Sequence, residues 1–139
     1  MKAKKITIGI FLGLMALAFT KVGIETLIDP QSTMDQVGIE LTNASASSSM
    51  RAVYGGLHLV FGIFCLWGAF YKRESALGLV CLYTLGYTIG RVSGIVADGA
   101  PNEFITSWIM TEAISGLLAG GLLVWLRQPA KVAGNVQVA

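Results

Sequence analysis

Three ionisable side chains stand inside otherwise apolar stretches of this sequence. Arg91 lies in "YTLGYTIGRVSGIVADGAP", Glu112 in "TEAISGLLAGGLL" and His58 in "RAVYGGLHLVFG". A guanidinium and a carboxylate can pair, and an unpaired guanidinium suits a carboxylate or phosphate through two parallel hydrogen bonds. An imidazole in such a place is a hydrogen-bonded core group or a proton carrier. The candidate chemistry is therefore helix-locking ion pairing, anion binding or proton transfer.

The elements that hold these side chains are predicted to be transmembrane helices. Of the 139 residues only 13% are charged, roughly half the ~25% of a soluble domain. The apolar residues gather in four runs, at residues 6–28, 51–70, 75–97 and 104–126. Each is near the ~20 residues that cross a ~30 Å hydrocarbon core, and none alternates as a barrel strand does. The sequence thus predicts an all-α, antiparallel four-transmembrane-helix bundle as one domain, residues 1–128, with a flexible tail over 129–139.

The basic residues predict the orientation of the bundle. They stand before the first run, between the second and third, and after the fourth: Lys2, Lys4, Lys5, Lys72, Arg73, Arg127 and Lys131. The other two loops contain acidic residues and no Lys or Arg. By the positive-inside rule both termini, and with them the tail, are cytoplasmic. No basic patch with interleaved aromatics is present, so nucleic acid is not an expected partner, whereas the lipid bilayer is.

The depths of the ionisable residues are not random. With each run centred in the bilayer, Arg91 lies ~7 Å to the outer side of the midplane, Lys21 ~6 Å, His58 ~4 Å and Glu112 ~4–5 Å. Charges inside a membrane cost several kcal/mol unless they are paired or hydrated, so they face a bundle interior or a water cavity. A polar pocket that opens outward above an apolar floor is therefore predicted.

Helical spacing gathers the candidate ligand-binding residues on inward faces. They are Arg51, Tyr54, His58, Tyr87, Arg91 and Glu112. Arg91 is expected to pair with Glu112, and Arg51 with Glu25. Two plainer interpretations stay open: the Arg91–Glu112 pair only locks two helices together, and His58 is only a hydrogen-bonded core residue. No catalytic residue is assigned.

Glycines recur every four residues within the runs. They are Gly86, Gly90 and Gly94 in the third, Gly116 and Gly120 in the fourth, and Gly9 and Gly13 in the first. Such spacing lets helices approach closely in lipid. Packing inside one bundle is the preferred interpretation, and a homo-oligomer interface is the alternative.

The remaining motifs predict local structure rather than chemistry. Asp29-Pro30 predicts a helix stop, and the Ser-rich segment before Arg51 is expected to be flexible. Cys65 and Cys81 are expected to be small apolar fillers. A single histidine without Cys-His spacing predicts no metal site, and no cofactor motif is present.

Three of these stretches together resemble a known family. "RAVYGGLHLVFG", "GRVSGIVADGAP" and the glutamate of "TEAISGLLAGGLL" are similar to the bacterial four-helix membrane proteins grouped as domain of unknown function 4345. The resemblance covers nearly the whole chain and implies the bacterial inner membrane. Its signature positions match here at Arg51, Gly55, Gly56, Arg91, Asp98, Gly99 and Glu112. It implies fold and topology, and no reaction.

Three functions are carried forward. The first is binding of an anionic or amphipathic small molecule or lipid in the outward pocket. The second is a structural or accessory subunit whose buried charges are internal braces. The third is proton-coupled transport or catalysis by Glu112 and His58, which ranks last because the chain has no inverted repeat and no nucleophile–base pair. The protein is thus expected not to be an enzyme.

Overall fold

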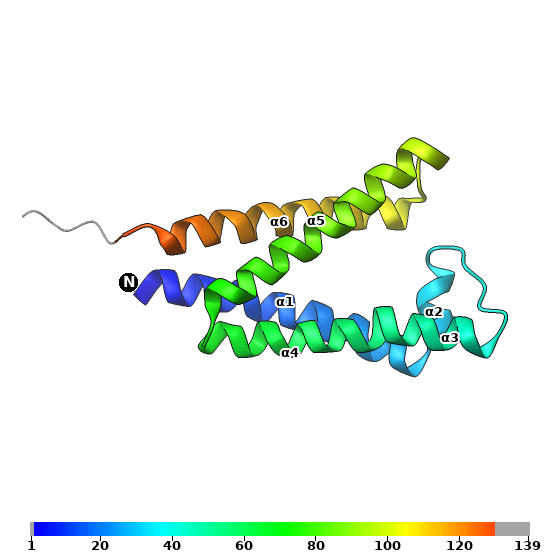
Figure 1. Ribbon diagram of the computed structural model, residues 1–139, viewed down its shortest axis with the longest axis horizontal. Helices are drawn as coiled ribbons and strands as arrows, with labels where there is room; N and C mark the ends of the chain where they lie inside the picture. The colour runs from blue at the N-terminus through cyan, green and yellow to red at the C-terminus, as the bar shows by residue number, and fades with distance from the viewer. Residues whose placement is uncertain (1, 130–139) are drawn as a thin grey trace, which may run out of the picture.

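The computed structural model describes residues 2–129, which form helices and no strand (Figure 1). The elements are α1 (Lys2–Ile28), α2 (Pro30–Asp35), α3 (Ala44–Met50), the π-helix η1 (Arg51–Gly56), α4 (Leu57–Phe70), α5 (Arg73–Asp98) and α6 (Glu103–Arg127). Since α3, η1 and α4 follow one another without a break, they are called the composite helix. Four segments are long and apolar enough to cross a membrane: α1, the composite helix, α5 and α6. The predicted all-α bundle is confirmed, whereas all of the predicted tail except Pro129 lies outside the described residues.

Capping groups end the helices where the sequence indicates. The Asp29 carboxylate accepts hydrogen bonds from the backbone N–H groups of Gln31 and Ser32, and Pro30 opens α2, so α1 stops at Ile28. A proline at the first helical position loses no intrahelical bond. At the end of α5, Gly99 has φ +93°, a backbone conformation that suits glycine.

The Ser-rich segment is helical, and the expectation of a flexible loop end was wrong. Asn43 caps α3 by accepting a hydrogen bond from the Ala46 N–H at 2.9 Å. The second predicted span therefore begins at Ala44, seven residues before the predicted start at Arg51. A capped turn joined directly to a long helix needs no nucleation of its own, and this explains why a serine run stays helical here.

The long helices pack as two pairs, the composite helix against α1 and α5 against α6 (Figure 1). Consecutive long helices run in opposite directions. We call the end that carries α2, α3 and the α5–α6 turn the loop end, and the end that carries Lys2, Arg127 and the α4–α5 turn the terminal end. Toward the loop end, α5 rises away from α4. The two pairs therefore meet at the terminal half and diverge at the loop half.

The buried apolar core fills the terminal half. Its buried members come from α1, α4, α5 and α6: Ile8, Leu12, Ala16, Phe19, Cys65, Ala69, Ala76, Leu77, Val80 and Ala119. The buried polar residues Thr26, His58, Thr84 and Glu112 lie nearer the loop end. This division has the form that the sequence predicts, an apolar floor below a polar layer.

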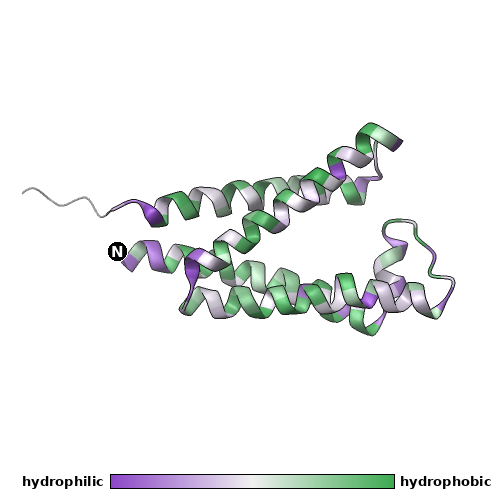
Figure 2. Ribbon diagram, viewed as in Figure 1, coloured by the Kyte–Doolittle hydropathy of each residue, from purple (hydrophilic) through white to green (hydrophobic). Residues whose placement is uncertain are grey.

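Hydrophilic residues mark the terminal end, and apolar residues make up most of the length of the long helices (Figure 2). Lys4 Nζ donates to the Trp125 carbonyl at 2.8 Å, and Arg127 pairs with Glu74 at 2.7 Å. Leu14, Leu82 and many other large apolar residues of the spans are exposed. An exposed apolar surface of this extent suits lipid rather than water.

Glycines do mediate close packing, but mostly not the ones expected. A Cβ at Gly62 would lie 3.0 Å from the Ala16 carbonyl oxygen, and one at Gly23 would lie 2.8 Å from the Leu59 nitrogen. The tight glycines are Gly23, Gly55, Gly62, Gly68 and Gly116. At Gly86, Gly90 and Gly94, and at Gly9, Gly13 and Gly120, a Cβ would meet nothing within 4 Å. Because α5 diverges from α4, no helix among residues 2–129 packs closely on its glycine repeat.

Candidate functional site

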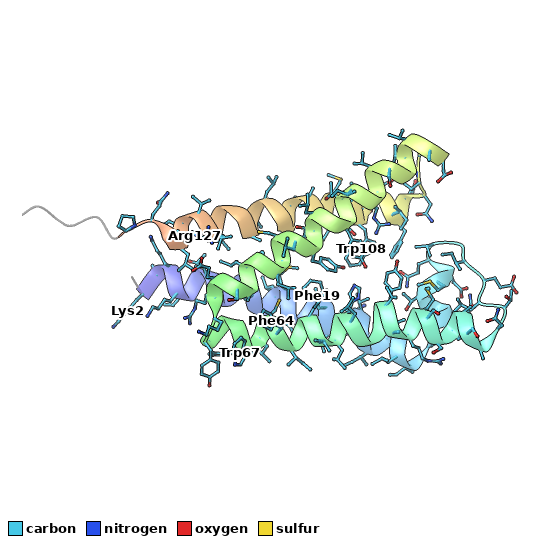
Figure 3. All side chains as sticks on the ribbon, in the orientation of Figure 1. Lys2, Phe19, Phe64, Trp67, Trp108 and Arg127 are labelled. Carbon is cyan, nitrogen blue, oxygen red and sulfur yellow. The ribbon has the colours of Figure 1, made fainter. Side chains whose placement is uncertain are left out.

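A cavity of about 280 Å³ lies between the two helix pairs in the loop half; we call it the central cavity. Figure 3 labels two of its residues, Phe19 of α1 and Trp108 of α6, both of which line it. Every long helix and α2 contribute to its wall. Of the six predicted ligand-binding residues, five line it: Tyr54, His58, Tyr87, Arg91 and Glu112.

The Arg91–Glu112 ion pair is present and joins α5 to α6. Arg91 Nε and Nη2 donate to the two Glu112 carboxylate oxygens at 3.3 and 3.1 Å. The Glu112 side chain is only 5% exposed, and that of Arg91 is 23% exposed. The guanidinium also lies over the Tyr87 ring, 5.8 Å from its centroid. Glu112 takes two of the five donor hydrogens of Arg91, and a further acceptor can use the others.

His58 connects α4 to α5. Its Nδ1 lies 3.1 Å from the Val53 carbonyl oxygen, and its Nε2 lies 2.9 Å from the Tyr83 hydroxyl. A carbonyl only accepts, so Nδ1 carries the hydrogen of the neutral ring and Nε2 accepts from Tyr83. The carbonyl belongs to η1, whose wider hydrogen-bonding pattern is a frequent feature of functional sites. The plainer interpretation of His58, a hydrogen-bonded core histidine, describes this geometry.

An aromatic cluster surrounds His58. Tyr54 stacks on the imidazole at 5.7 Å between ring centroids, and Tyr83 lies 4.5 Å from Tyr87. Phe19 meets Tyr83 edge-on at 4.7 Å. Sequence reasoning assigned no role to Tyr83 or Phe19. Tyr83 precedes Tyr87 by one helical turn, and that spacing is the signal that could have found it.

Arg51 does not line the central cavity. Its Nε donates to the Leu27 carbonyl at 3.1 Å, at the end of α1, and the residue is exposed. The expected Arg51–Glu25 pair is not formed, because Glu25 pairs with Lys21 one turn earlier on its own helix at 2.8 Å. The wide turn of η1 also changes the register, so Arg51 leaves the face that holds Tyr54 and His58.

The α2 segment lies over the loop end of the cavity. Met34 is 2% exposed, the Thr33 hydroxyl lies 3.0 Å from that of Thr26, and both Thr33 and Met34 line the cavity. The side-chain amide of Asn102, beside α6, donates to the Gln36 carbonyl at 3.1 Å. The pocket expected to open outward is thus covered at that end by chain that the sequence analysis placed in a loop.

A second hollow of about 700 Å³ runs along the loop half of α5; we call it the side groove. Leu82, Ile95 and Pro101 are among its apolar lining residues, and Asp98 lies near its loop end. Gly86, Gly90 and Gly94 line it as well. It shares five residues with the central cavity: Tyr54, Tyr83, Tyr87, Arg91 and Ile105. The two hollows therefore adjoin at Arg91 and the tyrosines.

The formal charges around the central cavity cancel. Lys21 and Arg91 are its cationic residues, and Glu25 and Glu112 are its anionic ones. Within residues 2–129 no group of three His, Cys, Asp or Glu side chains is placed to hold a metal ion. Cys65 and Cys81 are both free thiols. The residues present suit hydrogen bonding to a polar molecule.

Comparison with known proteins gives a family. The model of the family described as "Domain of unknown function (DUF4345)" matches residues 8–126, and the chain belongs to that family. The match covers the four spans and both hollows. No curated protein and no solved structure matches the chain.

Proposed function

We propose that this membrane protein binds the polar head group of an amphipathic membrane molecule in the central cavity. One observation carries the proposal: a hollow with an ion pair, a histidine and three tyrosines lies inside a bundle whose surface is apolar. Ionisable groups within membrane spans are rare and typically mark functional sites. The distribution of basic residues supports cytoplasmic termini, and the family resemblance supports a bacterial inner-membrane protein, so the central cavity lies at the level of the outer leaflet.

The charge balance favours a head group without net charge. Two cations and two anions line the cavity, so an anionic head would bring an unbalanced charge into a poorly hydrated space, at several kcal/mol. An uncharged or zwitterionic head with several oxygens avoids that penalty. Its oxygens would accept from Arg91 and from the hydroxyls of Tyr54 and Tyr87, while Glu112 holds the guanidinium in place. The sequence-based proposal used Arg51 and Arg91 as the contacts of an anion, and of these two Arg51 lies outside the cavity.

Native mass spectrometry of protein extracted gently from its own membranes tests the proposal. The informative variant is Arg91→Gln with Glu112→Gln, which keeps hydrogen-bonding groups but removes both charges. The matched control is Glu74→Gln with Arg127→Gln, since that pair also joins α5 to α6 but is exposed at the terminal end. A discrete adduct in wild type and control that disappears from the Arg91/Glu112 variant supports the proposal, and its mass gives the head-group class.

A second cavity variant guards against misfolding. Ser115→Leu fills part of the central cavity while Arg91 and Glu112 are both retained, and it should also lose the adduct. A chain without adduct in wild type, or the same adduct in all four proteins, would refute head-group binding. An anionic adduct would keep the binding site and overturn the argument from charge balance.

An accessory subunit is the second candidate function. The observation that favours it is the open glycine face of α5, on which a partner helix would pack closely. The same spectra decide this case, because a stoichiometric protein partner, or a second copy of the chain, adds a mass far larger than that of a lipid.

A further inference from the structure

We infer that the side groove holds the apolar chain of the ligand, which reaches the central cavity laterally from the bilayer between η1 and α5. This rests on the proposed function and adds the route and the shape of the ligand. The covered loop end is the first reason. Met34 and Thr33 of α2 lie over the cavity there, and the Asn102–Gln36 hydrogen bond ties the α5–α6 turn to the segment that follows α2. An amphipath with its chain in lipid has no path through that end.

The sizes of the two hollows are the second reason. The central cavity, at about 280 Å³, falls just below the ~300–1,000 Å³ of pockets that enclose whole small molecules. It has room for a head group and none for a long chain. The side groove, at about 700 Å³, adjoins the central cavity at the shared residues Tyr87 and Arg91 and extends from them along an apolar wall. A molecule with its head at Arg91 therefore has its chain in the groove.

The glycines of α5 are the third reason. Gly86, Gly90 and Gly94 line the groove, and a Cβ at any of them would meet nothing within 4 Å. Over these residues the helix rises ~12 Å, and the absent side chains leave a slender track of that length. Lipid tails gain no hydrophobic free energy by leaving lipid for protein. The track therefore selects ligands by the shape of their apolar chain. It admits a flexible unbranched chain while the head group is held in the central cavity.

Photolabelling in phosphatidylcholine nanodiscs tests this. The probe is a palmitoyl monoglyceride, which has an uncharged head, with a diazirine in its chain; labelled peptides are mapped by mass spectrometry. The informative variant is Gly90→Leu, which obstructs the track. Its matched control is Gly78→Leu, on the same helix and also with nothing within 4 Å of its Cβ, but outside the groove. Wild type and control should be labelled around Gly86–Ile95, and Gly90→Leu about tenfold less, or ~1.4 kcal/mol in binding.

A short-chain competitor separates the two proposals. Glycerol monobutyrate carries the same head with almost no chain, so it should displace the probe from wild type and still protect Gly90→Leu against thermal unfolding. If the competitor displaces the probe but Gly90→Leu and Gly78→Leu are labelled equally, the side groove does not hold the chain, and head-group binding still stands. No displacement, with labels spread evenly along all helices, would overturn both. Gly90→Ala should give a smaller loss, which confirms that the effect scales with side-chain size.

Discussion

Two glycine-rich faces of this protein have the same kind of sequence and opposite surroundings. Where α1 meets the composite helix, Gly23, Gly55 and Gly62 each lie against backbone or side chain of the other helix. On α5, Gly86 and Gly90 repeat with the four-residue spacing typical of close packing but meet nothing. The comparison teaches that small residues allow close approach without causing it. Whether such a face is packed or open depends on whether the neighbouring helices converge or diverge.

The largest expected effect separates these two faces directly. Gly62→Leu should abolish the folded protein, because the new side chain would meet the Ala16 carbonyl and the backbone of α1. Ordinary overpacking costs ~1–3 kcal/mol, and more where backbones must separate. Gly90→Leu should leave the melting temperature within a few degrees of wild type. Thermal unfolding of both variants in one detergent measures this, and equal losses would mean that α5 packs on a neighbour after all.

Much of this architecture follows from the sequence, for identifiable reasons. Run length predicts four spans, Asp29-Pro30 predicts the end of α1, and equal depth on consecutive helices predicts the Arg91–Glu112 pair. Each of these features belongs to one helix or to two helices joined by a short turn. In such a pair, the rise of ~1.5 Å per residue sets the depth of each residue relative to those on the other helix.

The features that the sequence did not reveal depend on contacts between elements that are distant in the sequence. The π-helix turns Arg51 off the cavity face, and α2 covers a cavity whose walls come from other helices. Neither is visible in hydropathy or spacing. Tyr83 was overlooked because its partner, His58, lies on another helix and the bond between them needs the crossing of α4 and α5.

The second prediction concerns the Arg91–Glu112 ion pair, which joins α5 to α6 beside the central cavity. Glu112→Leu alone should cost roughly 3 kcal/mol, because it leaves the half-buried Arg91 charge without its partner. Replacing both residues, Arg91→Met with Glu112→Leu, should cost clearly less, since no unpaired charge remains. A double-mutant cycle on unfolding free energies measures the coupling. If the double variant is fully stable and the adduct is absent from wild type too, the pair is a brace only.

A smaller effect is expected for the hydrogen bond that crosses the opening from α4 to α5. Tyr83→Phe removes the hydroxyl that serves His58 Nε2 and should cost about 1–2 kcal/mol, the penalty of an unsatisfied buried acceptor. Tyr71→Phe is the control, since Tyr71 is 73% exposed. If the two variants unfold alike, water replaces Tyr83 at His58, and the cavity is wetter than its aromatic walls indicate.

The smallest effect is expected at the terminal end, where α5 and α6 are joined by Glu74 and Arg127. Their ion pair is short, at 2.7 Å, but the side chains are 56% and 63% exposed, and exposed pairs contribute ~0–1 kcal/mol. Glu74→Gln should therefore lower stability by less than about 1 kcal/mol, and salt should abolish the difference. The core of Leu77 and Val80 already holds the helices together at this end. A loss as large as that of Glu112→Leu would mean that charges, rather than this core, fix the end at which the two helix pairs meet, and the divergence at the loop end would then need another cause.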